Sequence, residues 1–209
     1  MSFLAFTKRS FDMTAGEIKI CVLVSGGGTN LQALIDAEKS GIIHSGKISL
    51  VVSDNPDAYG LVRAEKNGIA TFISKDERDL VAKLKENHID MIVLAGYLKI
   101  LSPDVTSLYR NRIINVHPSL IPSFCGKGCY GLRVHRKALE YGVKVTGATV
   151  HFVNEIPDGG KIIAQKAVEI MDDDTPQTLQ KRVMQEAEWI LLPRATEKLA
   201  AELKGGIAL

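Results

Sequence analysis

Asn115 and His117 stand two positions apart at the end of an apolar run, in the sequence NVHPSL that follows Ile113 and Ile114. If this run is a strand, the two side chains lie on the same face, because strand side chains alternate. Ligands of open α/β sheets bind beyond the carboxyl ends of the strands, so both side chains would face that crevice. An amide and a protonated imidazole aimed at one point predict two donors for an oxyanion, whereas a metal would require further ligands nearby. The alternative is that both residues cap backbone groups where the strand ends.

Asp158 is a third candidate for catalysis, in the sequence NEIPDGG, where Gly159 and Gly160 predict a sharp turn. A carboxylate beside His117 would raise the pKa of that histidine and fix the orientation of its ring. The pairing of Asp158 with His117 is a hypothesis at this point, because an aspartate before two glycines more often serves only the turn.

A glycine-rich segment, SGGGTN from Ser25 to Asn30, separates an expected strand from an expected helix. Glycines allow the backbone to approach an anion, and the first turn of a helix offers it free N–H groups. Three interpretations stay open: the tip of the segment holds a single phosphate, the segment binds a dinucleotide, or it is only a tight turn. Leu31 replaces the third glycine of the dinucleotide motif, although Asp54 could act as its ribose-binding acid. The Gly-Lys-Ser/Thr ending of a nucleoside triphosphate site is missing.

The remaining histidines and the cysteines give weaker signals. His135 falls in a segment rich in arginine and lysine, and His151 alternates with apolar residues. The alternation favours a strand histidine with a satisfied hydrogen bond over a functional residue at position 151. Cys125 and Cys129 form a C-x3-C spacing, which without a second ligand pair is a weak zinc signal. No metal site is predicted.

Alternating strand and helix patterns predict the elements that must position these residues. Strands are expected at 18–24, 48–52, 70–73, 91–94 and 112–116, and helices at 29–40, 58–66, 77–87, from 102 and at 132–141. Two further strands, 145–153 and 161–170, predict a hairpin, after which Thr175 and Pro176 are expected to begin a final helix. The fold class is therefore α/β: a doubly wound, mostly parallel, Rossmann-like sheet with a C-terminal antiparallel hairpin and a final helix.

Composition and charge limit the classes of partner. The chain has 209 residues, 45% of them hydrophobic, with 26 basic and 24 acidic side chains. This near balance predicts neither a nucleic-acid nor a membrane partner. Three cysteines without a disulfide pattern indicate a reducing compartment, and no apolar run is long enough to span a membrane, so a cytoplasmic location is expected. Residues 1–17 are expected to form a partly disordered leader, and residues 18–209 a single domain.

Six segments of the chain resemble the glycinamide ribonucleotide formyltransferases, which belong to the folate-dependent formyltransferase family. The segments are VSGGGTNLQAL, VVSDNPDAYGLVRAEKNGIAT, VLAGYLKILSPDV, IINVHPSLIPSF, GATVHFVNEIPDGGKIIAQ and EAEWILLP. The resemblance runs from about Ile18 to the final helix. N-x-H-P-S-L with the downstream D-G-G is specific to the wider family, and the G-G-T-N-L-Q-A loop points to glycinamide ribonucleotide as the substrate.

The resemblance implies transfer of a formyl group from 10-formyltetrahydrofolate to the amine of glycinamide ribonucleotide, a step of purine synthesis. Asn115 and His117 match the residues that stabilise the tetrahedral oxyanion. Asp158 matches the carboxylate that keeps this histidine protonated and oriented and assists proton movement through water.

The resemblance also implies which residues bind the two small-molecule substrates. Gly28, Thr29 and Asn30 would hold the ribonucleotide phosphate together with Gln185, and Glu188 would contact the ribose. The folate pocket would be lined, largely through backbone groups that read the pterin edge, by Leu98, Lys99, Ile100, Leu101, Asn154 and Glu155. The oligomeric state stays open.

Two departures from the family pattern affect these expectations. The segment PSFCGKGCYGLRVH, at 122–135, is longer than the family's P-x-Y-P-G form, so its contacts are not carried over. Lys99 stands where an arginine is frequent, and Arg78 is only a loose match for an arginine on the folate side.

Two kinds of rival function remain. One is another folate enzyme, either a methionyl-tRNA formyltransferase or a formyltetrahydrofolate hydrolase. Each usually carries an additional domain, for which little room is expected in this chain. The other is a non-catalytic nucleotide-binding Rossmann protein, which the missing third glycine and the joint presence of Asn115, His117 and Asp158 disfavour.

Overall fold

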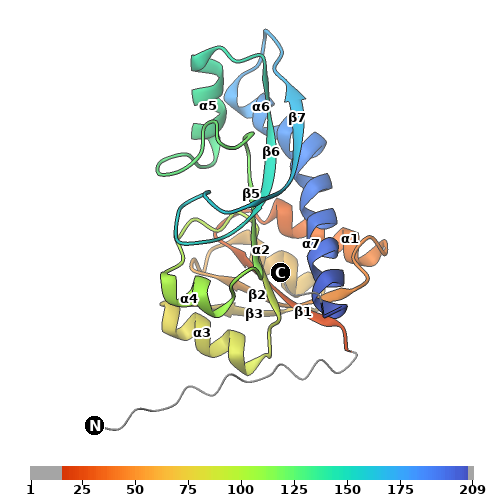
Figure 1. The fold of residues 1–209 in the computed structure, drawn as a ribbon. Coiled ribbons are helices and arrows are strands. Elements are labelled where there is room, and N and C mark those ends of the chain that lie inside the picture. Colours follow the sequence, from red (N-terminus) through yellow and green to blue (C-terminus); the bar gives the residue numbers. More distant parts are fainter. Residues whose placement is uncertain (1–15, 207–209) are drawn as a thin grey trace, which may run out of the picture.

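The structure, a computed structural model, describes residues 16–206 (Figure 1). The leader expected at residues 1–17 lies outside the described residues except for Gly16 and Glu17, which are exposed and precede the first strand. Within the described range, no helix is long and apolar enough to cross a membrane.

Strands and helices alternate along most of the chain, as expected. The strands are β1 (Ile18–Val24), β2 (Gly46–Ser53), β3 (Ala70–Ile73), β4 (Met91–Leu94), β5 (Ile113–His117), β6 (Val145–Phe152) and β7 (Ile162–Glu169). The helices are α1 (Thr29–Lys39), α2 (Tyr59–Lys66), α3 (Glu77–Glu86), α4 (Pro103–Leu108), α5 (Leu132–Tyr141), α6 (Pro176–Val183), the π-helical turn η1 (Met184–Glu188) and α7 (Trp189–Lys204).

One seven-stranded sheet runs through the described part of the chain in the order β3-β2-β1-β4-β5-β6-β7. The pairs from β3 to β5 are parallel, while β6 pairs antiparallel with both β5 and β7. The strand order reverses between β1 and β4, which is the place where open α/β sheets bind ligands. The predicted fold class, including the added hairpin, is confirmed.

Helices cover both faces of the sheet because the strands are apolar on both sides. Along β1, Ile20, Val22 and Val24 pack with residues of α1, α2 and α7, whereas Cys21 and Leu23 pack with residues of α3 and α4. Figure 1 shows α3 and α4 at the end of the molecule away from α6, and the long α7 running beside the sheet. Burial on both faces holds the central strands rigidly, and their carboxyl ends can therefore carry fixed side chains.

Two boundaries differ from the prediction in ways that matter for function. Strand β5 ends at His117 and not at Val116, so the histidine belongs to the strand. The predicted final helix is divided into α6 and α7 by the turn η1, whose five residues form a π-helix. The start of α6 is as predicted: Thr175 accepts a hydrogen bond from the Thr178 N–H in a capping box, with Pro176 in the first turn.

Candidate active site

Asn115 and His117 lie on the same face of β5, at the carboxyl edge of the sheet. In the parallel ladder Asn115 pairs with Leu94, the last residue of β4, and on the other side it pairs with His151 of the antiparallel β6. His117 is buried and Asn115 partly buried. The shared orientation predicted from the alternation of strand side chains is therefore present, and β6 contributes a second imidazole.

The loop between β6 and β7 brings Asp158 back to this edge. Its ends are joined by a hydrogen bond of 2.9 Å from the Phe152 N–H to the Lys161 carbonyl. Gly160 packs so closely that a Cβ atom there would overlap the backbone oxygen of Phe152, which explains why glycine occupies the turn. Asp158 itself has a φ of 56°, a left-handed conformation that is uncommon for a residue with a side chain. Such backbone strain concentrates at functional sites.

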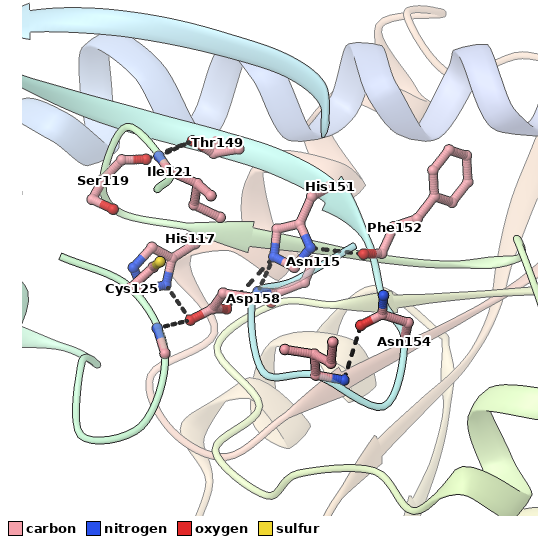
Figure 2. A network of polar contacts seen from close by, with 12 residues as sticks. Asn115, His117, Ser119, Ile121, Cys125, Thr149, His151, Phe152, Asn154 and Asp158 are labelled. Atoms are coloured by element: carbon pink, nitrogen blue, oxygen red, sulfur yellow. Dashed lines mark hydrogen bonds and ion pairs between the residues drawn. The ribbon is translucent and has the colours of Figure 1, made fainter. Parts of the chain in front are cut away.

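The Asp158 carboxylate lies between two imidazoles (Figure 2). Its Oδ2 atom is 3.5 Å from Nδ1 of His117, and its Oδ1 atom is 3.6 Å from Nε2 of His151. The Gly126 N–H donates to Oδ2 at 2.8 Å. Burial by itself would raise the pKa of Asp158, but the contacts with His151, His117 and the Gly126 N–H outweigh burial and lower it. The carboxylate is therefore ionised at neutral pH.

His117 is held by its neighbours through both ring nitrogens. Nε2 donates to the Phe124 carbonyl at 3.0 Å, and Nδ1 faces Asp158. Burial lowers the pKa of His117, and this effect outweighs the Asp158 charge and the Phe124 carbonyl, which both raise it. Asp158 thus raises the pKa of His117 as expected, but by less than burial lowers it. On balance the pKa of His117 is lowered and not raised as expected, because removing a charged imidazole from water costs more than one carboxylate at 3.5 Å offsets.

His151 is a strand histidine with a satisfied hydrogen bond, as predicted, and it also contacts Asn115 and Asp158 of the candidate site. Its Nε2 atom is 3.1 Å from the Asn115 side-chain nitrogen, and its Nδ1 atom is 2.8 Å from its neighbour's carbonyl, that of Phe152. A carbonyl only accepts, so Nδ1 carries a proton and Nε2 accepts from Asn115. An amide nitrogen has two hydrogens, and this contact leaves one of them for a ligand.

A cavity of about 290 Å³ opens onto these side chains. Of the six residues expected in the folate pocket, five line it, and Glu155 does not: the lining includes Leu98, Lys99, Ile100, Leu101 and Asn154. Leu98 and Ile100 are 63% and 68% exposed, which is unusual for large apolar side chains and leaves them available to a flat apolar ligand. Residues 126–131, whose contacts the sequence could not assign, also line the cavity.

Asp54 stabilises this cavity and is not a ribose-binding acid in this structure. It accepts a hydrogen bond of 2.7 Å from the Ser25 hydroxyl and lies 3.7 Å from the Lys99 ammonium. The Ser25 oxygen in turn accepts from the Leu98 N–H at 3.0 Å. These contacts connect the 95–101 loop to the glycine-rich segment. Because Asp54 is engaged in them, it does not support the interpretation of this segment as a dinucleotide site.

The glycine-rich segment forms the amino end of α1. Gly28 has a φ of 69°, and a Cβ atom there would lie 2.6 Å from the Cα atom of Gly60, so only glycine fits. Thr29 and Asn30 are the first residues of the helix, which has no side-chain cap. Their position leaves N–H groups of the first turn for an anion, consistent with a phosphate site.

The turn η1 packs against this helix end. Asn30 donates to the Glu188 carboxylate at 2.7 Å, while its own Oδ1 atom is buried with no hydrogen-bond partner among residues 16–206. Burial raises the pKa of Glu188 to about 7, against a smaller lowering by Asn30. Gln185 is exposed on the same turn. Glu188 and Asn30, both predicted from the resemblance, are thus brought together.

Two other features lie apart from the cluster. A larger hollow of about 560 Å³ between α1 and α7 contains none of Asn115, His117 and Asp158. His135, expected among charged side chains, is fully buried on α5, and burial lowers its pKa to about 4, with a smaller effect of His117. No group of three or more potential metal ligands occurs within the described part of the chain.

Known proteins are similar to this chain in sequence and in architecture. Residues 18–196 match the model of the family described as formyl transferase. The chain is 44% identical over 184 residues to a phosphoribosylglycinamide formyltransferase of Haemophilus influenzae, covering 84% of each chain. It is 39% identical over 178 residues to a chloroplastic phosphoribosylglycinamide formyltransferase of Arabidopsis thaliana, covering 80% of this chain and 61% of that relative.

A solved structure agrees with these relatives. The crystal structure of phosphoribosylglycinamide formyltransferase from Anaplasma phagocytophilum superposes with a TM-score of 0.82 at 36% identity, covering 90% of this chain and 89% of that one. The chain spans 61% and 63% of the length of the two chloroplast relatives, from Arabidopsis thaliana and Vigna unguiculata.

Proposed function

Because the chain belongs to the formyl transferase family, we propose that it transfers the formyl group of 10-formyltetrahydrofolate to the amine of glycinamide ribonucleotide. The observation that carries the proposal is the convergence of Asn115, His117 and Asp158 on one cavity at the carboxyl edge of the sheet. Amide, imidazole and carboxylate are the groups that acyl transfer to an amine requires: donors for an oxyanion and a base for a proton.

The cavity supports a folate as the formyl donor. Leu98 and Ile100 supply exposed apolar surface for a flat ring, and the backbone of this loop and of the 154–158 loop supplies donors and acceptors for its polar edge. Lys99, at the rim, adds a cation for the carboxylates of the folate tail. Glu155 does not line the cavity, so of the two residues expected from this loop only Asn154 is proposed to contact the folate.

The helix end supports a phosphorylated nucleotide as the acceptor. The backbone of Gly28, Thr29 and Asn30 would hold the phosphate at the positive end of α1. Gln185, exposed on η1, would contact the same phosphate. Glu188 and the unpartnered Oδ1 atom of Asn30 would accept hydrogen bonds from the ribose hydroxyls.

The chemistry follows from the donors at the end of β5. The amine nitrogen attacks the formyl carbon, and the carbonyl electrons move onto oxygen. The remaining amide hydrogen of Asn115 stabilises that oxyanion together with the Nε2–H of His117, which the Phe124 carbonyl holds in place, and Asp158 accepts the amine proton through water. Collapse of the intermediate breaks the bond between the formyl carbon and the folate nitrogen, which takes up a proton.

We also propose that a single domain comprises residues 18–209, that the protein works in the cytoplasm, and that its partners are small molecules and not nucleic acids or membranes. The net charge of +2 and the absence of a membrane-spanning helix within residues 16–206 are compatible with these statements.

A formyl-transfer assay tests the proposal directly. Purified protein is mixed with 10-formyltetrahydrofolate and glycinamide ribonucleotide, and formylated nucleotide and tetrahydrofolate are measured together. We expect both products in equal amounts, and only when both substrates are present. Release of formate without the nucleotide would instead identify a hydrolase, and binding of either substrate without turnover would identify a non-catalytic protein.

A further inference from the structure

The loop that follows β5 fixes two of the catalytic groups. We call residues 124–131 the cysteine loop, because it contains Cys125 and Cys129. On one side of Cys125, the Phe124 carbonyl accepts from His117 at 3.0 Å; on the other, the Gly126 N–H donates to Asp158 at 2.8 Å. Any rearrangement of the backbone at Cys125 therefore changes the contacts of both His117 and Asp158.

The two thiols of the loop are accessible and have different surroundings. Both cysteines are partly exposed, whereas the third, Cys21, is fully buried. The Cys125 thiol donates to the Pro122 carbonyl at 3.2 Å. The sulfur of Cys129 accepts from the Lys137 ammonium at 3.1 Å. A cation beside sulfur stabilises the negative charge of an attacking thiolate, so Cys129 is the better nucleophile of the pair.

The backbone between the cysteines contains two glycines in a turn with open space around them. The Cys129 N–H donates to the Gly126 carbonyl at 3.0 Å, which forms a turn that brings the chain back toward Cys125. Gly126 and Gly128 have φ values of 80° and 82°, and a Cβ at either would meet no atom within 4 Å. A disulfide requires Cα atoms about 4.4–6.8 Å apart. Two glycines between the cysteines give the loop the freedom to reach this separation.

We propose that Cys125 and Cys129 form a thiol–disulfide exchange site for low-molecular-weight disulfides such as oxidised glutathione, and that the internal disulfide lowers formyl transfer. The thiolate of Cys129 attacks one sulfur of oxidised glutathione, whose S–S bond breaks to release one reduced glutathione. Cys125 then loses its proton to water and attacks the Cys129 sulfur, which releases the second. Two protein thiols are oxidised, and one external disulfide is reduced to two thiols.

The loss of activity follows from the position of Cys125 between two catalytic contacts. When its sulfur turns from the Pro122 carbonyl to Cys129, the adjoining peptide groups move with it. Asp158 then loses the Gly126 N–H, and His117 loses the Phe124 carbonyl. Reduction of the disulfide restores both contacts, so the effect is reversible.

The first experiment measures the thiols alone and does not depend on the proposed activity. The full-length protein is incubated with oxidised glutathione, and its thiols are counted after denaturation, with mass spectrometry of the peptides. We expect two thiols to be lost to a Cys125–Cys129 disulfide, while Cys21 stays reduced as an internal control. In Cys125→Ser we expect a stable glutathione adduct on Cys129, and in Cys129→Ser little reaction.

The second experiment connects the disulfide to the site and rests on the proposed function. Oxidation of the wild type should lower kcat by about 10²-fold, the cost of a small displacement of catalytic groups. Dithiothreitol should restore it, and in Cys129→Ser, which forms neither the adduct nor the disulfide, the ratio of kcat after the treatment to kcat before it should stay close to one. The titration of His117, followed by NMR, should also shift on oxidation, and this readout remains informative if no formyl transfer is found.

Two results would overturn the proposal. One is a wild-type protein in which oxidised glutathione gives only mixed or intermolecular disulfides. The other is an internal Cys125–Cys129 disulfide that leaves both kcat and the His117 titration unchanged.

Discussion

The two ends of the candidate site are prepared for their ligands in opposite ways. At the end of β5, Asn115, His117 and Asp158 already contact protein partners, namely His151, Phe124 and Gly126. At the start of α1, the Asn30 Oδ1 atom is buried without a partner among the described residues, and Glu188 has its pKa raised to about 7. The first end is organised by contacts within the protein, whereas the second keeps an acceptor that the proposed nucleotide would satisfy. Loss of a group should therefore affect the rate at the first end and binding at the second.

The largest effect is expected from removing the donors at the organised end. Asn115→Ala and His117→Ala should each lower kcat by about 10²–10³-fold, the usual cost of one oxyanion donor, with a much smaller change in KM. Steady-state kinetics with both substrates provide the measurement, and circular dichroism controls for folding. Near-normal kcat in both variants would mean that these residues are structural.

A smaller effect on the rate is expected from Asp158→Asn, which keeps the shape of the side chain and removes its charge. Asp158 raises the pKa of His117 against the effect of burial, so its loss should move that pKa further below the ordinary value. The His117 titration should therefore shift to lower pH, and kcat should fall by about 10²-fold through the lost base. NMR of the imidazole and the pH–rate profile test this. An unshifted titration would show that Asp158 does not influence the pKa of His117.

At the other end, Glu188→Gln should change binding more than rate. Replacement of a carboxyl oxygen that would accept from a ribose hydroxyl should raise KM for the nucleotide up to about tenfold, because a hydrogen bond contributes about 0.5–1.5 kcal/mol. Glu186→Gln, on the exposed side of the same turn, is the matched control and should bind normally. A lower kcat with unchanged KM in Glu188→Gln would remove the difference between the two ends.

Glu188 should also make stability depend on pH. Its folded-state pKa is raised from 4.5 to about 7, so the folded state binds the proton more tightly than the unfolded state. The stability gained in this way is fully present below the unfolded pKa and is lost as pH rises through about 7. Tm of the wild type should therefore fall between pH 6 and pH 8 relative to Glu188→Gln, by about the few degrees that 1 kcal/mol represents. If Tm of the wild type and of Glu188→Gln changed with pH in the same way, the raised pKa of Glu188 would be contradicted.

No effect is expected from removing metal ions. The organised end acts through fixed donors, so excess EDTA should leave kcat unchanged, and the same holds for nucleotide binding at α1. A loss of formyl transfer in EDTA that zinc restores would show that the donors of β5 are not sufficient.

Local patterns predicted the fold and part of the site well. The alternation of side chains places Asn115 and His117 on one face whatever the rest of the chain does, and the Thr175 capping box depends on neighbours in sequence. The prediction of β4 as a buried strand similarly required only the apolar composition of its own residues. Features that depend on a few consecutive residues were therefore accessible from the sequence.

Features that depend on distant contacts were not. His151 joins the site because β6 pairs with β5 in a register that neither strand specifies alone. The net lowering of the His117 pKa depends on how deeply the ring is buried, and its Phe124 contact depends on the fold of the cysteine loop. The one signal for His151 in the sequence was its position on the strand that leads to Asp158, and this signal is weak.

The π-helical turn η1 also determines where the chain tolerates a change of length. An α-helix turns by about 100° per residue, so adding one residue would normally rotate everything that follows onto a different face. A π-turn absorbs one residue locally and leaves the helices before and after it in phase with the core. A one-residue deletion within Met184–Glu188 should thus give a continuous helix in which α6 and α7 keep their buried faces, while Glu188 moves away from Asn30. At this point insertions and deletions can alter a ligand contact without altering the fold.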